Sequence, residues 1–212
     1  MSADYLLIFT RYPRPGRSKT RLIGELGPEG AAWLQRRLTE RVVDEAKRLA
    51  AQYPVQIQVH FYDGDEEQLS DWLGPLVYRP QVEGDLGRKM GAAMRGAIEE
   101  MGTAPGSVVL IGSDIPQIDV SLLRQAFRTL AWNEVVLGPS RDGGYYLVGL
   151  TAAVGPRVLP LLFDEMRWST ETVLYETLGR LGANGCSVQL LPTLRDIDRP
   201  EDLALIKELG LL

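Results

Sequence analysis

Short apolar runs alternate with amphipathic helical patterns along the chain, and this alternation constrains its fold more than any other feature. We predict strands at residues 5–9, 55–62, 76–78, 107–111, 134–138, 145–150 and 187–191. We predict helices at residues 28–51, 66–73, 88–101, 120–130, 170–181 and 200–209. Strands that alternate with helices form right-handed crossover units around a mostly parallel sheet. We therefore expect an α/β fold of three layers (α/β/α) with a mostly parallel mixed sheet, in a single domain spanning residues 1–212.

Capping residues indicate where two of these helices begin. Asp119 is predicted to cap the helix at 120–130, and Ser169 or Thr170 the helix at 170–181. Short polar side chains suit this position because they accept hydrogen bonds from free amides of the first turn. Pro28 and Pro200 are expected in first turns, where a missing amide hydrogen costs nothing.

Composition and charge exclude several classes of protein. The 212 residues are 45% hydrophobic and 24% charged, which is typical of a globular domain with one core. Lys and Arg number 23 against 28 Asp and Glu, so the net charge of −5 argues against a broad nucleic-acid or anionic-membrane surface. The first apolar run is too short for a signal peptide or a membrane span. With Cys186 the sole cysteine, these features predict a cytoplasmic protein, and a homodimer is compatible with them. The sole histidine, His60, lies in a strand-like run and is expected to be structural.

A basic segment directly follows the first strand, at the sheet edge where α/β proteins bind ligands. Residues 10–21 contain five basic side chains and no acid. We predict that Lys19 and Arg21 contact phosphate oxygens from the solvent side of this loop, together with Arg11, while Gly16 lets backbone amides approach the ligand. A solvated basic loop is the alternative. Walker A and GxGxxG patterns are missing, so neither a P-loop NTPase nor a nicotinamide dehydrogenase is indicated.

Two acidic motifs are candidates for metal binding. Asp114 follows the most apolar predicted strand, where a rigidly held carboxylate can bind Mg²⁺ or Mn²⁺ together with substrate phosphates. Helix capping is the alternative role. Asp198 is predicted to be a second metal ligand, with capping equally open. Asp196, Glu201 and Asp202 are expected to complement the dipole of the last helix.

Two glycine motifs are candidates for holding the rest of a ligand. Asp142 precedes Gly143, Gly144 and Tyr145 in a tight turn that could hold a sugar-like ligand, although Asp-Gly is also an ordinary hairpin signal. The second motif opens a helix whose backbone amides could receive a nucleotide base or phosphate. It contains Gly84, Asp85 and Gly87.

Taken in order, six motifs resemble a known family over nearly the whole chain. They are Lys19-Thr-Arg-Leu22, Gly84-Asp-Leu-Gly-Arg-Lys-Met90, Ile111-Gly-Ser-Asp-Ile-Pro116, Asp142-Gly-Gly-Tyr-Tyr-Leu147, Trp168-Ser-Thr170 and Asp196-Ile-Asp198 with Pro-Glu-Asp-Leu203. The series is similar to bacterial glycosyltransferase-like proteins known as radical-SAM/selenodomain-associated transferases, some of them arsenosugar-biosynthesis glycosyltransferases. The resemblance implies a GT-A, Rossmann-like nucleotide-diphospho-sugar transferase fold, with Asp114 in the place of the metal-binding acid. The chain departs from the family at Arg11, where a lysine is expected, and at Ile115, where cysteine is frequent.

The reaction is left open by this resemblance, because fold analogy does not determine chemistry. The N-terminal loop and the Asp198-x-Pro-Glu-Asp-Leu ending also resemble small nucleotidyltransferases, such as phospholactate guanylyltransferase and the molybdenum-cofactor enzymes. We favour metal-dependent glycosyl transfer from a nucleotide-sugar to a small-molecule acceptor, with Asp142 orienting the acceptor or acting as base. Trp168, Ser169 and Thr170 would complete the acceptor pocket. The alternatives are nucleotidyl transfer from an NTP to a phosphorylated molecule, with release of pyrophosphate, and a non-catalytic nucleotide-sugar binder.

Overall fold

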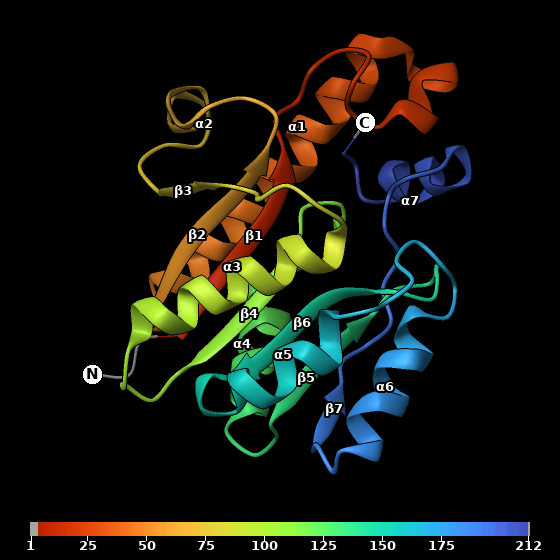
Figure 1. The fold of residues 1–212 in the computed structure, drawn as a ribbon. Helices are drawn as coiled ribbons and strands as arrows, with labels where there is room; N and C mark the ends of the chain where they lie inside the picture. Colours follow the sequence, from red (N-terminus) through yellow and green to blue (C-terminus); the bar gives the residue numbers. More distant parts are fainter. Residues whose placement is uncertain (1–3, 212) are drawn as a thin grey trace.

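A computed structural model describes residues 4–211, and its strands form one sheet in the order β3-β2-β1-β4-β6-β5-β7 (Figure 1). The strands are β1 (Asp4–Arg11), β2 (Val55–Tyr62), β3 (Val77–Pro80), β4 (Ser107–Gly112), β5 (Val135–Pro139), β6 (Tyr145–Thr151) and β7 (Val188–Leu190). Within this sheet β6 alone runs antiparallel to its neighbours, β4 and β5. The predicted mostly parallel mixed sheet is confirmed.

Helices connect most of these strands, as the alternating pattern predicts. They are α1 (Ile23–Ala50), α2 (Glu66–Leu73), α3 (Leu86–Met101), α4 (Val120–Leu130), α5 (Gly155–Phe163), α6 (Val173–Ala183) and α7 (Leu203–Glu208). Short 3₁₀ turns cover Thr20–Leu22, Ala152–Val154 and Pro200–Asp202. None of the helices within residues 4–211 combines the length and the apolarity needed to cross a membrane. Helix α5 was not predicted, because Pro156 and Pro160 hide its pattern.

The three layers form because successive residues of each strand face opposite sides of the sheet. Leu6 and Ile8 of β1 pack in the core beneath α1, α2 and α4. Leu7 and Phe9 of the same strand pack on the other side, beneath α3, α5 and α6. Figure 1 shows α3 and α5 lying over one face of the sheet, with α1 on the other. The predicted α/β/α arrangement is confirmed.

The helix starts confirm one predicted cap and correct the other. The Asp119 carboxylate accepts a hydrogen bond from the amide of Leu122 at 2.8 Å, as expected of an N-cap. Helix α6 instead begins at Val173, after Thr172, and no side chain caps it. The Thr170 hydroxyl donates to a carbonyl of the preceding loop at 2.9 Å, so the capping prediction for residues 169 and 170 is wrong.

Two features bring distant segments to the carboxyl edge of the sheet. Because β5 runs parallel to β4, the β5–β6 turn at residues 140–144 lies at the same edge as the ends of β1 and β4. A small apolar cluster then holds the C-terminal segment beside the start of α1. It comprises Leu22, Leu34, Leu38, Ile197 and Ile206.

Candidate functional site

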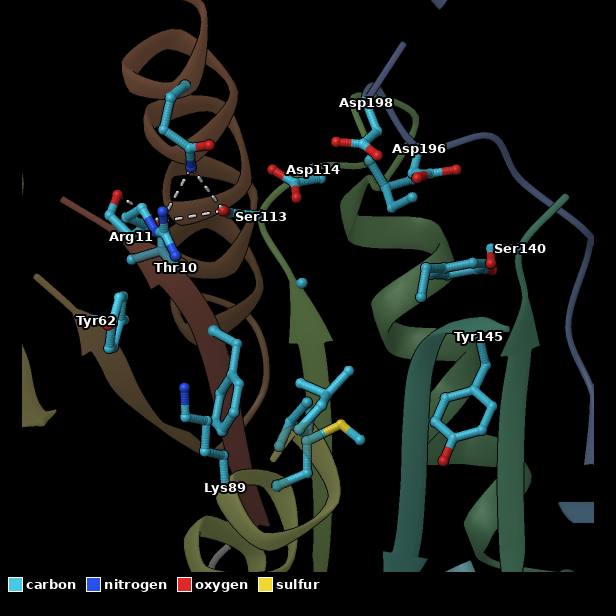
Figure 2. Close-up of a pocket in the computed structure, with 18 of the residues that line it drawn as sticks. Thr10, Arg11, Tyr62, Lys89, Ser113, Asp114, Ser140, Tyr145, Asp196 and Asp198 are labelled. Atoms are coloured by element: carbon cyan, nitrogen blue, oxygen red, sulfur yellow. Dashed lines mark hydrogen bonds between the residues drawn. The ribbon is translucent and has the colours of Figure 1, made fainter. Parts of the chain in front are cut away.

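A cleft of about 630 Å³ opens at the carboxyl edge of the sheet. It brings together the N-terminal loop, the end of β4, the β5–β6 turn and the C-terminal segment (Figure 2). Among the predicted site residues, the lining includes Arg11, Lys19, Arg21, Asp114, Asp142, Tyr145 and Asp198. The remaining predicted site residues do not line it: Gly16, Gly84, Asp85, Gly87, Gly143, Gly144, Trp168, Ser169 and Thr170.

Lys19 does not lie on the solvent side of its loop, and this expectation is wrong. Its side chain is only 3% exposed, and Nζ lies 2.6 Å from an oxygen of the Asp114 carboxylate. Nζ also donates a hydrogen bond to the carbonyl of Ile197 at 2.5 Å. Because the Ile197 amide in turn donates to the Asp114 carbonyl at 3.0 Å, Lys19 links the N-terminal loop, the end of β4 and the C-terminal segment.

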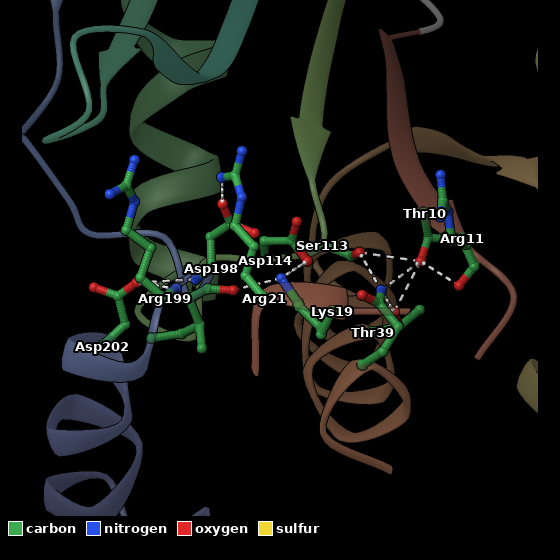
Figure 3. Close-up of polar contacts among 12 residues, drawn as sticks. Thr10, Arg11, Lys19, Arg21, Thr39, Ser113, Asp114, Asp198, Arg199 and Asp202 are labelled. Carbon is green, nitrogen blue, oxygen red and sulfur yellow. Dashed lines mark hydrogen bonds and ion pairs between the residues drawn. The ribbon is translucent and has the colours of Figure 1, made fainter. Parts of the chain in front are cut away.

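Three further cations of the loop are also balanced by acids that are distant in sequence. Arg21 is exposed and pairs with the Asp198 carboxylate (Figure 3). Arg14 and Arg17 pair with Asp63 at 3.4 and 3.5 Å. The charge segregation seen in the sequence is therefore largely compensated in the fold. Both predicted metal ligands, Asp114 and Asp198, are held by a loop cation.

Two cations of the cleft have no acidic partner among residues 4–211. Arg11 and Lys89 both line the cleft, and neither takes part in an ion pair formed within residues 4–211. Lys89 was missed in the sequence, although it lies inside the Gly84–Met90 motif in the first turns of α3. The sequence did contain a signal for Lys89, because this residue lies one turn past the start of a helix at the ligand-binding edge of the sheet.

Asp142 holds its own turn together. One of its oxygens, Oδ1, accepts hydrogen bonds from the Ser140 hydroxyl and, at 3.0 Å, from the Gly144 amide. Gly143 has a φ of +89°, and a Cβ there would lie 2.2 Å from the Glu171 carbonyl oxygen, so the turn requires glycine. The motif thus makes the hairpin between β5 and β6 and presents Asp142 to the cleft at the same time.

Asp196 is the second residue missed in the sequence, where we assigned it to the helix start. It is half-buried in the cleft lining, and burial together with the neighbouring Asp142 charge raises its pKa above the usual range of a carboxyl group. Asp202 alone takes the capping role, accepting from the amides of Asp198 and Arg199 at 3.0 and 2.7 Å. The Asp-Ile-Asp pattern was the signal, because residues two apart in an extended segment point the same way.

The Trp168 motif lies behind the cleft wall. The Trp168 ring packs edge-on against Tyr145, with centroids 6.2 Å apart, and tilts against Phe163 at the same distance. A Cβ at Gly87 would lie 2.3 Å from Nε1 of Trp168, so Gly87 permits this close packing of α3. The neighbouring Asp85 caps α3 through the Arg88 amide at 2.8 Å. In this structure Trp168, Gly87 and Asp85 therefore contribute to packing and helix capping.

The carboxylates of the cleft suit a hard cation that brings further ligands with it. Asp114, Asp196 and Asp198 offer oxygen atoms, which Mg²⁺ and Mn²⁺ prefer. Within residues 4–211, no three acidic, histidine or cysteine side chains converge into a ready-made metal site. Mg²⁺ sites that use one or two carboxylates are completed by water and substrate phosphates. The residues present therefore fit a metal that arrives with a phosphate ligand.

Comparison with solved structures identifies the fold. A "putative nucleotide-diphospho-sugar transferase" from Desulfovibrio desulfuricans G20 is 31% identical, covers 99% of this chain and 88% of its own, and superposes with a TM-score of 0.88. The 4-diphosphocytidyl-2C-methyl-D-erythritol synthase of Anaerococcus prevotii DSM 20548 is 13% identical, covers 99% of both chains and gives a TM-score of 0.61. A manganese complex of Rv0371c from Mycobacterium tuberculosis H37Rv is 16% identical, covers 98% of this chain and 99% of its own, and gives 0.57. The last two show the fold alone.

The sequence comparisons name the family. No curated protein matches the chain. Residues 45–170 match the family described as "Uncharacterized protein conserved in bacteria (DUF2064)", which is more than half of the chain. The chain therefore belongs to the DUF2064 family and has the fold of the nucleotide-diphospho-sugar transferases.

Proposed function

We propose that this protein is a divalent-metal-dependent transferase that moves the glycosyl group of a nucleotide-sugar to a small-molecule acceptor. The supporting observation is the composition of the 630 Å³ cleft, in which a basic N-terminal loop meets four aspartates from three other segments. A diphosphate and its metal ion match this juxtaposition of charges, since phosphate oxygens attract the cations and the metal attracts the carboxylates. The name of the 31%-identical structure supports the same class of substrate.

In this proposal Asp114 and Asp198 would hold Mg²⁺ or Mn²⁺ together with phosphate oxygens of the donor, and the charge of the metal would stabilise the negative charge that develops on the leaving diphosphate. The manganese complex of Rv0371c supports the use of such a metal. Arg11 contacts the phosphates on the opposite side of the cleft. Arg21 and Lys19 already contact the metal-binding carboxylates, so they can bridge these carboxylates and the phosphates.

Asp142 is placed to act on the acceptor. Its Oδ1 atom is used within its own turn, whereas Oδ2 makes no hydrogen bond within residues 4–211. Ser140 and the Gly144 amide fix the carboxylate, so Oδ2 can orient an acceptor hydroxyl or accept its proton without a change of rotamer. Asp142→Ala should therefore reduce turnover much more than nucleotide affinity, and equal losses of both would place this residue in the donor or metal site instead.

Nucleotidyl transfer is the second candidate, and one observation favours it. Trp168, Ser169 and Thr170 do not line the cleft, so the aromatic and hydroxyl groups expected for a sugar pocket are displaced from it. The basic and acidic groups that remain serve an NTP and its metal equally well. A non-catalytic binder is the third hypothesis, but Asp114, Asp142 and Asp198 are all in place.

A thermal-shift panel of NTPs and nucleotide-sugars, each with and without Mg²⁺ or Mn²⁺, tests the proposal, followed by product analysis of whatever binds. Release of a nucleoside diphosphate supports glycosyl transfer, and release of pyrophosphate establishes nucleotidyl transfer. Asp114→Asn should abolish the metal-dependent part of the shift. Asp71→Asn, at an exposed site on α2, is the matched control and should retain it. If no nucleotide stabilises the wild-type protein in either metal, the proposal is wrong.

A further inference from the structure

One wall of the cleft contains two positive charges that no acid balances. Arg11 ends β1, and its Nη1 donates to the carbonyl of Arg17 at 2.7 Å. Lys89 comes from α3, a different element on the same wall. The loop cations Lys19 and Arg21 each have a carboxylate partner, whereas no ion pair within residues 4–211 involves Arg11 or Lys89.

The two cations share one aromatic ring. The Arg11 guanidinium carbon lies 4.8 Å from the centroid of Tyr62, and Lys89 Nζ lies 4.5 Å from it. Tyr62 ends β2, pairs with Arg11 in the sheet register and is 41% exposed at the edge of the cleft. Figure 2 shows Arg11, Tyr62 and Lys89 together on one side, across the cleft from Ser140 and Tyr145.

Such an arrangement favours the binding of an anion. Two cations drawn to one ring repel each other, and the ring quadrupole attracts each of them only weakly where water has access. When an anion binds between the two cations, each cation contacts an opposite charge, and this attraction outweighs the repulsion between them. The ion pairs within residues 4–211 supply no acid to either cation, so a bound anionic ligand would be their first charged partner.

We propose that Arg11, Tyr62 and Lys89 form a clamp for the diphosphate of the donor, in which Arg11 and Lys89 bind the phosphate oxygens and Tyr62 positions both cations. The ligand class rests on the proposed function, since a nucleotide-sugar or NTP carries adjacent phosphates. Arg11 offers a planar fork of donors, and Lys89 offers a compact charge, so the two can hold neighbouring phosphate groups. The clamp lies across the cleft from Ser140, whose hydroxyl contacts Asp142, so the acceptor side is left free.

Binding of inorganic pyrophosphate and of the best nucleotide from the panel, measured by calorimetry with Mg²⁺, tests the clamp. Lys89→Met keeps the aliphatic stem and should weaken both ligands about tenfold or more, the usual effect of losing a charged hydrogen bond. Arg88→Met is the matched control, because Arg88 precedes Lys89 in the same helix, is exposed and does not line the cleft. It should change affinity by less than about twofold, the range of distant surface changes.

Variants of Tyr62 test whether the ring positions the two cations, because they change the ring and leave both charges in place. Tyr62→Phe keeps the ring and should bind like wild type, whereas Tyr62→Leu should bind both ligands several-fold more weakly at unchanged charge. Equal affinities of Tyr62→Phe and Tyr62→Leu would overturn the positioning role.

Other outcomes separate this inference from the proposed function. If wild type binds a nucleotide and Lys89→Met binds it as well as Arg88→Met does, the clamp is refuted and the proposed function stands. If wild type binds pyrophosphate but no nucleotide, and Lys89→Met loses pyrophosphate, the clamp is supported and the proposed function is not. Melting of each ligand-free variant near the wild-type temperature confirms that the fold is intact.

Discussion

Lys19 and Arg21 are both basic residues of one loop and both contact an aspartate of the cleft, but the structure predicts a larger loss of stability when Lys19 is replaced. Lys19 is 3% exposed and makes an ion pair at 2.6 Å and a hydrogen bond at 2.5 Å. Arg21 is 63% exposed and makes a surface ion pair. Lys19→Met and Arg21→Met remove the charge while keeping an apolar stem, so they compare a buried contact with an exposed one.

The expected losses differ in size. Lys19→Met removes a charged hydrogen bond to the Ile197 carbonyl, a contact worth roughly 1.5–3 kcal/mol. The Asp114 side chain left behind is 47% exposed as a whole, but the Oδ1 atom that Lys19 contacts is buried and has no hydrogen-bond partner within residues 4–211, so part of the penalty for an unpaired buried charge remains. Relief of the Lys19 desolvation offsets part of the loss, and we expect a net destabilisation of about 1–3 kcal/mol. Arg21→Met should cost about 0–1 kcal/mol, as exposed pairs do.

Melting temperatures in the absence of ligand measure the difference. At about 2–4 °C per kcal/mol for a domain of this size, Lys19→Met should melt roughly 2–12 °C lower than wild type, and Arg21→Met no more than about 4 °C lower. If Lys19→Met melts within about 1 °C of wild type, or if the two variants lose equally, the buried link between the loop, β4 and the C-terminal segment does not exist in solution.

Further variants test other parts of the structure. Burial, and secondarily the Arg79 charge, lower the pKa of His60 to about 4, against about 6.5 in the unfolded chain. Because the unfolded chain then binds a proton that the folded protein resists, the free energy of unfolding is unaffected above pH 6.5 and falls by up to about 3 kcal/mol between pH 6.5 and 4. In urea unfolding, His60→Gln should flatten this part of the pH dependence. Gly87→Ala places a methyl group against Trp168 and should lower the melting temperature by several degrees, by overpacking of about 1–3 kcal/mol. Arg21→Met should also bind Mn²⁺ alone more tightly than wild type in a paramagnetic titration, because Asp198 loses the cation that competes with the metal; unchanged or weaker Mn²⁺ binding would argue against Asp198 as a ligand.

Much of the fold could be predicted because its information is local. The strand pattern at 55–62 and the helix patterns at 66–73 and 120–130 match β2, α2 and α4 to the residue. Parallel strands joined by helices then leave a single functional edge. For that reason the basic loop and Asp114, each of which directly follows a predicted strand, could be expected at one edge of the sheet, and both line the cleft.

The remaining features depend on contacts between segments that are distant in sequence. Lys19 is separated by more than 170 residues from the Ile197 carbonyl that it contacts, and no periodicity reports such a contact. Trp168 belongs to a motif that resembles a site, yet the missing Cβ of Gly87 lets its ring pack inside. Helix α5 contains Pro160, whose lost backbone bond is offset by burial of Leu159, Leu162 and Phe163 against α3.

Ile197 explains how two aspartates from the end of the chain reach a cleft built at its beginning. Its side chain is 0% exposed in the small cluster beside α1, its amide donates to the Asp114 carbonyl, and its carbonyl accepts from Lys19. Both backbone groups and the side chain are therefore fixed, which leaves the flanking Asp196 and Asp198 little freedom to move relative to Asp114. The proposed metal site needs its carboxylates held in position before the ligand arrives, and Ile197, an apolar residue next to Asp198, would hold them there. The energy that folds the C-terminal segment onto the domain is thus also the energy that assembles the acidic half of the cleft.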